Sequence, residues 1–514
     1  YPLGRPSLIP VRGPVDTPTL YTECAETLPI EETTVLYECF FGRSMSCNPY
    51  ALFRHVLDRP ECAGWRHVWV LDNESKIPPG LSAMRRVVFV KRESPLYLRY
   101  LATAKYLVNN VTFPPYFSRR EGQFYLNTWH GTPLKTLGLD VRGGNVFDHK
   151  NVARNFLHVT HLCSPNAHTS DALIRPYHVA GTFAGKLAET GYPRIDRTLN
   201  LSPEERAALR KRLGLADGEK VVLYAPTWRG DQGESRFDVE RLKRDLERLG
   251  RLPAQLLFRG HHFTEKLLAS QNLGVTVVPG DIDTNDLLSV VDVLVTDYSS
   301  IFFDFMPTGR PILYYVYDRE EYAASRGLYF EMEEMPGPKC ETIETLEDEL
   351  RRLLESGGCQ TADELYRKAQ ARFCAHEDGH ASRRVADWFF FGASAKEIRR
   401  EGKTGASVLF YTVPFMPNGI TTSVLNLLAS LSATDLRLSV GVDPSAVASE
   451  PERMEKFRER PDGVEVLARV GRMNQTPEEF WVTRRFHTRY VLDGEGQGRA
   501  YARVFEREFV RLFG

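Results

Sequence analysis

The sequence predicts an α/β protein with two doubly wound lobes that face each other across a cleft, followed by a partial third α/β unit. Two observations support this prediction. Short apolar runs alternate with helix-favouring stretches between about residues 33 and 195, and a second series with the same rhythm begins at residue 220. Such alternation is typical of parallel sheets covered by helices. The length of 514 residues is enough for about three domains.

The first lobe is expected over 31–200, after a proline-rich stretch, 1–30, that we interpret as an extended tail or linker. Its buried strands are predicted in the segments TTVLYECF, HVWVLDN, RRVVFVK, AKYLVNN and QFYLNTW. The helices between them are predicted in ALFRHVL and SPLYLRYLATA.

The second lobe is expected over 201–395. It opens with SPEERAALRKRL, where an N-cap serine, a proline in the first turn and early acidic residues indicate a helix start. Its strands are predicted in KVVLYAPTW, AQLLFRGHH, VTVVPG, VDVLVTDYSS and RPILYYVYD. Helices are expected near 342–357, 361–374 and 380–391.

A charged linker, 396–405, precedes the third segment, 406–514. The segment starts with a strand, a loop and a helix in SVLFYTVPFMPNGITTSVLNLLASLS. Because it contains only part of an α/β unit, we expect the chain to belong to a larger protein.

Composition excludes several classes of protein. The 66 basic and 67 acidic residues nearly cancel, which gives no indication of a nucleic-acid partner. The eight cysteines form no CxxC pair, which fits a reducing cytosol. No apolar run approaches the roughly 20 residues of a membrane span, so any membrane attachment is expected to be peripheral. A local basic cluster, Arg85, Arg86, Lys91 and Arg92, is either a solvated face or a contact for anionic lipid head groups.

The most unusual motif of the first lobe is WHGTPLK, at 129–135. Pro133 prevents continuation of a strand, and Gly131 permits a sharp reversal of the chain. His130 is therefore either a core histidine at a strand end or an imidazole turned toward a substrate, and the motif alone leaves both open. Lys135 would place a cation over the same cleft.

Two motifs of the second lobe suit an anionic ligand. In FRGHH, Arg259 and His261 are two residues apart on an extended segment, so they share a face and can bind a phosphate. In TDYSSIFFDF, Ser299 and Ser300 precede a helix whose N-terminal N–H groups favour an anion. The alternatives are a surface arginine with a half-buried histidine, and simple helix capping.

Further candidates follow neighbouring strands. In YAPTWRG, Thr227 and Arg229 would point into the cleft, where Arg229 can meet a diphosphate, unless the segment is an ordinary surface turn. Asp297 and Asp304 are candidates for contact with substrate hydroxyls, with a solvated helix residue as the alternative for Asp304. The sequence has no P-loop and no HExxH. We therefore expect catalysis by cationic side chains and helix dipoles, without a dedicated metal site. No cofactor is expected to be required, and a divalent cation could still take part.

Taken together, these motifs resemble the CDP-glycerol glycerophosphotransferases, which are the teichoic acid primases and polymerases. The resemblance covers about 33–392 and rests on motifs that occur in the same order: WHGTPLK, GYPRID, LYAPTWRG, the Arg-x-His of FRGHH, TDYSSIFFDF and RGLYF. The third segment resembles instead the first half of a retaining glycosyltransferase with two Rossmann-like lobes.

The resemblance implies a GT-B architecture and transfer of a polyol phosphate, with release of CMP. The donor would be CDP-glycerol or CDP-ribitol, and the acceptor a lipid-linked polyol-phosphate or glycan chain at the cytoplasmic face of the membrane. It implies that His130 is the general base, that His261 lies at the donor diphosphate and that Ser299 and Ser300 receive phosphate. Two rival functions stay open: a nucleotide-sugar glycosyltransferase on the same fold, and a non-catalytic scaffold that binds polymer.

Overall fold

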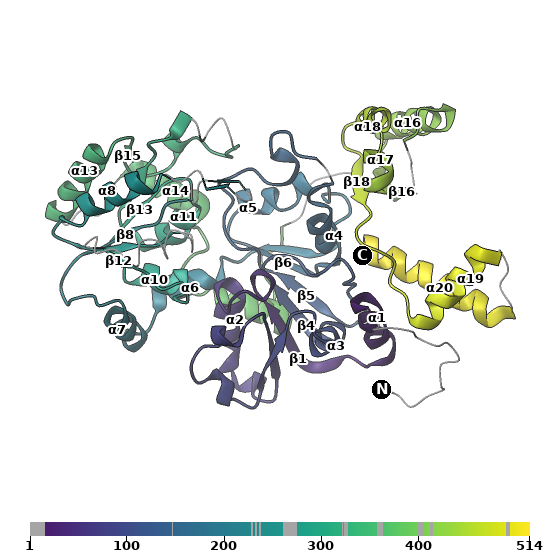
Figure 1. Ribbon diagram of the computed structural model, residues 1–514, viewed down its shortest axis with the longest axis horizontal. Coiled ribbons are helices and arrows are strands. Elements are labelled where there is room, and N and C mark those ends of the chain that lie inside the picture. The colour runs from purple at the N-terminus through teal and green to yellow at the C-terminus, as the bar shows by residue number, and fades with distance from the viewer. Residues whose placement is uncertain are drawn as a thin grey trace.

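The computed structural model describes residues 16–145, 147–227, 230–231, 234–235, 238–260, 275–320, 322, 327–356, 363–398, 405–411, 415–489 and 494–514. Two α/β lobes lie side by side, and a smaller third unit lies beyond the first lobe (Figure 1). The predicted α/β class with parallel sheets is confirmed.

The first lobe is built on a seven-stranded sheet in which every neighbouring pair of strands is parallel. Its order is β3 (Val87–Lys91), β2 (Arg66–Leu71), β1 (Glu31–Glu38), β4 (Ala104–Asn109), β5 (Phe124–Asn127), β6 (His161–Ser164) and β7 (Lys186–Glu189). The strands are apolar because helices cover both faces. These helices are α1 (Thr17–Thr27), α2 (Cys47–Leu57), α3 (Pro95–Thr103), α4 (Lys150–His158), α5 (Ala167–Ala172) and α6 (Pro193–Asn200).

The second lobe has six parallel strands. Their order is β12 (Thr276–Val277), β11 (Gln255–Phe258), β8 (Val221–Tyr224), β13 (Val293–Thr296), β14 (Ile312–Tyr315) and β15 (Lys339–Cys340). The strand order reverses between β8 and β13, and ligands bind at such a switch point. The helices are α7 (Pro203–Arg212), α8 (Val239–Leu249), α10 (Thr284–Ser289), α11 (Ile301–Phe305), α13 (Ile343–Ser356) and α14 (Glu364–Phe373).

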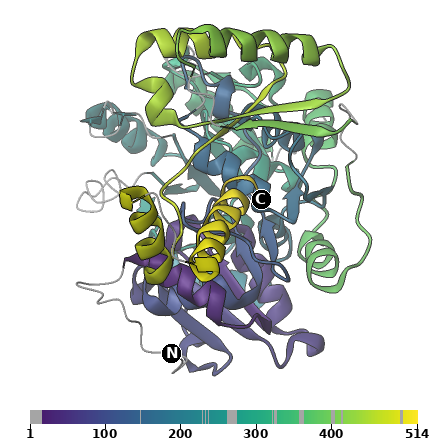
Figure 2. The same ribbon diagram turned by 90° about the vertical axis from the view of Figure 1, so that its right-hand side faces the viewer.

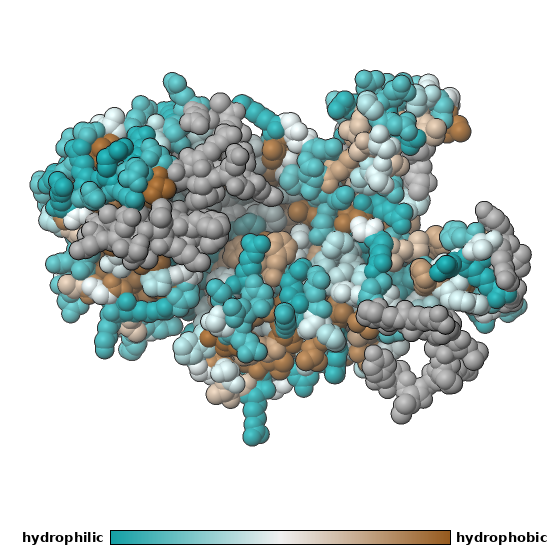
Figure 3. Space-filling model, in the orientation of Figure 1, coloured by the Kyte–Doolittle hydropathy of each residue, from teal (hydrophilic) through white to brown (hydrophobic). Residues whose placement is uncertain are grey.

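The surface over α8 and α13 is largely hydrophilic in Figure 3. Both helices bury leucines, among them Leu246 and Leu350, against the second sheet. Their polar residues therefore face solvent, as expected for amphipathic helices that cover a sheet.

The expected extended tail, 1–30, contains a helix, which corrects the prediction. Asp16 caps α1 by accepting a hydrogen bond from the backbone N–H of Thr19 at 3.0 Å. Tyr21 is 1% exposed, packs in the core of the first lobe and donates from its hydroxyl to the carbonyl of Ser118 at 2.7 Å. The helix forms because the first lobe offers this tyrosine a site, which local proline content does not reveal.

The expected second lobe, 201–395, includes α15 (Ala381–Phe391), but this helix packs on the first lobe. Its aromatic residues Trp388, Phe389 and Phe390 join the core around β1 and β2. The chain therefore crosses between the lobes twice. The two crossings touch where the Asn200 side chain donates to the carbonyl of Gly379 at 2.8 Å.

The third unit has a parallel sheet of β16 (Ser407–Tyr411), β17 (Arg437–Val442) and β18 (Glu465–Ala468). Its helices are α16 (Gly419–Ser432), α17 (Pro444–Ala448), α18 (Pro451–Arg458), α19 (Pro477–Arg489) and α20 (Gly494–Phe513). Figure 2 shows α19 and α20 beside the start of the first lobe. There the buried Arg511 of α20 donates to the carbonyl of Pro115 at 2.6 Å. No helix in the described ranges is long and apolar enough to cross a membrane.

Candidate active site between the lobes

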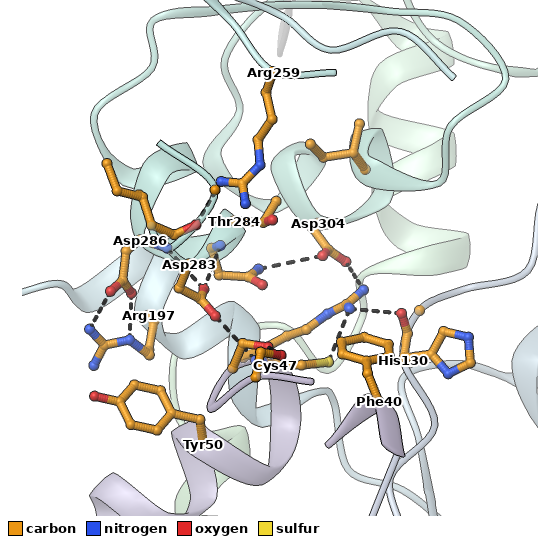
Figure 4. Close-up of a pocket in the computed structure, with 18 of the residues that line it drawn as sticks. Phe40, Cys47, Tyr50, His130, Arg197, Arg259, Asp283, Thr284, Asp286 and Asp304 are labelled. Atoms are coloured by element: carbon orange, nitrogen blue, oxygen red, sulfur yellow. Dashed lines mark hydrogen bonds and ion pairs between the residues drawn. The ribbon is translucent and has the colours of Figure 1, made fainter. Parts of the chain in front are cut away.

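A cleft of about 1520 Å³ separates the two lobes. Segments that follow strand ends line part of it: 129–135 from the first lobe, and 225–227, 259–260 and 298–301 from the second. Figure 4 shows side chains from both lobes converging on it. The cleft therefore lies where a doubly wound sheet places a ligand.

His130 lies on a tight turn after β5. Trp129 and Gly131 on either side of it have positive φ angles of 49° and 147°. The Asn48 side chain donates to the carbonyls of Thr128 and Trp129, both at 3.2 Å. Trp129 is 8% exposed and packs in the core of the first lobe, so the turn sends the tryptophan inward and leaves the histidine at the cleft.

The tautomer of His130 follows from a hydrogen bond at Nδ1. Its Nδ1 lies 2.8 Å from the carbonyl oxygen of Asn110, and because a carbonyl only accepts, Nδ1 carries the hydrogen. Nε2 then keeps its lone pair. Burial lowers the pKa of His130 to about 4, with a smaller contribution from the cationic Arg194 and against the opposing effect of the bond to Asn110. The imidazole is therefore neutral near pH 7 and able to accept a proton at Nε2.

Arg194 and Asp304 join the two lobes beneath this turn. Arg194, from α6, pairs with Asp304, from α11 of the second lobe, at 2.7 Å. Figure 4 shows Asp304 and His130 near each other, with the ion pair drawn as a dashed line from Asp304. Asp304 is 4% exposed, and its second oxygen accepts from Asn285 at 3.4 Å. Both oxygens thus have protein partners, which favours a role in joining the lobes over the predicted contact with substrate hydroxyls.

Asp297 also has a protein partner. Its carboxylate accepts from the backbone N–H of Thr227 at 2.8 Å and from the Thr227 hydroxyl at 2.6 Å. Asp297 is 2% exposed, whereas Thr227 lines the cleft. The aspartate therefore holds the turn after β8 in place, and Thr227 is the member of the pair that a ligand can reach.

Ser299 and Ser300 line the cleft at the start of α11. The Ser299 hydroxyl accepts from the backbone N–H of Ile301 at 3.4 Å, while Ser300 makes no capping bond through its side chain. The Ser300 hydroxyl oxygen is 3.6 Å from the position that a Cβ on Gly131 would occupy. The predicted serine pair thus lies directly opposite the His130 turn.

The remaining predicted residues divide into two groups. Arg259 and Lys135 line the cleft: Arg259 donates to the carbonyl of Ile282 at 2.7 Å, and the Lys135 amine is 5.6 Å from the centre of the Tyr322 ring. Arg229 and His261 lie outside the described residues, so their predicted places stay predictions. Among the residues that the structure does describe, no three His, Cys, Asp or Glu side chains form a group that could hold a metal ion.

Sequence reasoning missed two parts of the site. It did not single out Asn48 or Arg194, although Arg194 lies in the quoted GYPRID motif. It also gave no role to GLYF, at 327–330, which pairs with the segment after the His130 turn. There Tyr329 donates its backbone N–H to the carbonyl of Leu134 at 2.8 Å. Both segments lie in motifs that carry the family resemblance, but no local pattern indicated that they touch.

Comparison with known proteins identifies the family. The sequence model of the CDP-Glycerol:Poly(glycerophosphate) glycerophosphotransferase family matches residues 20–390 and ends before the third unit. The chain is 32% identical over 389 residues to a teichoic acid poly(glycerol phosphate) polymerase of Bacillus spizizenii, covering 70% of this chain and 92% of that protein. It is 30% identical to a teichoic acid glycerol-phosphate transferase of Staphylococcus aureus, covering 69% and 92%.

A ribitol-phosphate polymerase and a solved structure also match the chain. A teichoic acid ribitol-phosphate polymerase of Staphylococcus aureus, TarL, is 28% identical over 247 residues, covering 45% of this chain and 42% of that protein. A solved structure of the wall teichoic acid polymerase TagF with CDPG has a TM-score of 0.63 and 28% identity, covering 73% of this chain and 93% of that one. The chain therefore belongs to the CDP-glycerol:poly(glycerophosphate) glycerophosphotransferase family.

Proposed function

We propose that this enzyme transfers glycerol phosphate from CDP-glycerol to the terminal hydroxyl of a growing polyol-phosphate polymer and releases CMP. The observation that carries the proposal is the neutral His130, fixed through Nδ1, opposite the paired serines of the second lobe. Glycerol is favoured over ribitol as the polyol because four glycerol-phosphate relatives match over 381–393 residues, whereas three ribitol-phosphate relatives match over 247–323 residues.

In the proposed reaction the acceptor hydroxyl oxygen attacks the β-phosphorus of the donor. A bond forms between this oxygen and phosphorus, and the bond from phosphorus to the bridging oxygen breaks as CMP leaves. Nε2 of His130 takes the hydroxyl proton, a contribution of typically 10²–10⁴-fold to the rate. The remaining catalysis is positioning and electrostatic stabilisation of the charge on the phosphates, as phosphoryl transfer requires.

The donor phosphates are proposed to bind at the switch point of the second sheet. Thr227, Ser299, Ser300 and Arg259 surround this part of the cleft. Hydroxyl donors and one guanidinium there suit a diphosphate. Arg229 and His261, which follow the same strand ends in the sequence, are proposed to complete the group.

The acceptor is proposed to be lipid-linked and to reach the enzyme at the inner face of the membrane. Arg85 and Lys91 are exposed on the first lobe, and Met84, which precedes Arg85 in the sequence, is 39% exposed. Basic side chains beside an apolar one suit a peripheral contact with anionic lipid. Binding to vesicles with and without anionic lipid, by wild type and by an Arg85→Glu/Lys91→Glu variant, tests this part.

The test of function is donor choice. The enzyme is incubated with a short glycerol-phosphate acceptor and, in turn, CDP-glycerol, CDP-ribitol or a UDP-sugar. Mass analysis of the product and quantification of CMP and UDP follow. We expect CMP and an acceptor longer by one or more glycerol phosphates. UDP release would support the glycosyltransferase alternative, and donor binding without turnover would support the scaffold.

A further inference from the structure

The guanidinium of Arg194 makes an unusual set of contacts. The side chain belongs to α6 of the first lobe, and the residue is 8% exposed. One terminal nitrogen, Nη1, donates to the carbonyl of His130 at 2.7 Å and to the sulfur of Cys47 at 3.4 Å. The other, Nη2, donates to Asp304 of the second lobe at 2.7 Å. A single planar group thus contacts the His130 turn and the opposite lobe at once.

The first contact holds a turn that is costly to form. A residue other than glycine with positive φ, such as Trp129, is in an unfavourable backbone conformation. Three successive carbonyls of this turn accept hydrogen bonds from side chains. Asn48 donates to those of Thr128 and Trp129, and Arg194 donates to that of His130. Asn48 also accepts from the backbone N–H of Arg194 at 3.1 Å. The two side chains therefore fix the backbone that carries the imidazole.

The second contact ties this turn to the serine pair. Asp304 lies one turn after Ser300 in α11, so the ion pair sets the distance between that helix and His130. Gly131 leaves the space that the guanidinium needs, since a Cβ there would be 3.0 Å from Nη2. Lysine would keep the charge but has no fork with which to bind both partners.

We propose that Arg194 is a positioning residue for the transfer reaction, holding His130 in register with Ser299 and Ser300 across the cleft. This inference rests on the proposed function. Arg194 makes its contact through the carbonyl of His130, so it does not take part in the proton transfer itself. It determines where Nε2 of the base lies relative to the phosphate site.

Arg197 offers a matched control. It lies three residues later in the same helix and pairs with Asp286 of the second lobe at 2.5 and 2.8 Å. Arg197→Lys thus weakens a similar ion pair between the lobes without touching the His130 turn. The experiment measures CMP release by three full-length proteins: the wild type, Arg194→Lys and Arg197→Lys. For each, kcat and the KM for CDP-glycerol are determined.

We expect Arg194→Lys to lower kcat by about 10²-fold, the usual effect of a displacement of about 1 Å, with the KM changed less than about threefold. We expect Arg197→Lys to keep kcat within about twofold. Methylguanidinium added to Arg194→Ala should restore kcat by about tenfold or more, because it can refill the vacated site. A purely structural role would show no such recovery.

Two results would overturn the inference. One is an Arg194→Lys enzyme with near-normal kcat. The other is an equal loss of kcat in the Arg194→Lys and Arg197→Lys enzymes, which would mean that any ion pair between the lobes has the same effect. Wild-type CMP release, measured first, tests the proposed function separately from the role of Arg194.

Discussion

A methyl group added at Gly131 should disable the enzyme while leaving it folded. Gly131 has a φ of 147°, a region in which L-residues are strained by about 1–3 kcal/mol. The new Cβ would also lie 3.0 Å from Nη2 of Arg194, closer than the contact distance of about 3.5 Å. The guanidinium must therefore move by a few tenths of an ångström, and the His130 carbonyl that it binds moves with it.

A second glycine provides a control that separates the effect of backbone strain from the effect of displacing Arg194. Gly80, in the same lobe, has a φ of 85°, but a Cβ there would meet no atom within 4 Å. Both Gly131→Ala and Gly80→Ala should reduce the free energy of unfolding by about 1–3 kcal/mol. Only Gly131→Ala should also reduce kcat, by about 10²-fold, because only it displaces the base.

The assay is urea unfolding of both variants followed by CMP release at saturating donor and acceptor. Equal kcat in the two variants would refute the reasoning, since the position of His130 would then not depend on the space beside Arg194. Loss of kcat with a large rise in the KM for CDP-glycerol would also contradict it, because the displaced group belongs to the base and not to the donor site.

Four further predictions concern His130 itself and other parts of the molecule. With a pKa of about 4, His130 stays neutral at all pH values above that, so kcat/KM should hold from about pH 7 to about pH 5 and fall below; a fall centred near 6.5, the usual value, would contradict the burial argument. His130→Gln should lower kcat by 10²–10⁴-fold and leave donor binding, measured by calorimetry, nearly unchanged. Asp297→Asn should raise the KM for CDP-glycerol by about tenfold, because the charge-assisted bonds that fix Thr227 weaken; an unchanged KM would separate Thr227 from the donor. Tyr21→Phe should cost about 1 kcal/mol of unfolding free energy by removing the bond to Ser118. Glu26→Gln in the same helix, which weakens an exposed ion pair with Arg507 at 2.9 Å, should cost less.

All the strands that the sequence predicted in the two lobes are present, but β6, β7 and β15 were not predicted. The helix expected near 380–391 is present as α15, whereas its packing on the first lobe and the formation of α1 were not predicted. Strands such as β4 and β13 are buried on both faces, so their apolar character appears in a short stretch of sequence. Helix α1 and helix α15 depend on distant partners: Tyr21 packs with Tyr116, and Trp388 with His161. No local pattern carries that information.

The residues of the candidate site also divide into those that a local sequence pattern predicts and those that it does not. His130 was recognisable because Gly131 and Pro133 disturb the strand pattern beside it. Its supports were not recognisable, since Asn48 lies 80 residues from the carbonyl of Thr128 and Arg194 lies 64 residues from His130. For Asp304 the reverse holds. Its position in the TDYSSIFFDF motif predicted contact with substrate, whereas its burial and its two protein partners favour a role in joining the lobes.

The two crossings of the chain between the lobes have a consequence for how the cleft opens. Because they run side by side and are joined at Asn200 and Gly379, they define a line about which one lobe can rotate relative to the other, whereas sliding along that line is restricted. Points far from a rotation axis travel furthest. A rotation that opened the cleft at 134–137 and 327–330 would have to break the backbone bonds that join these two segments.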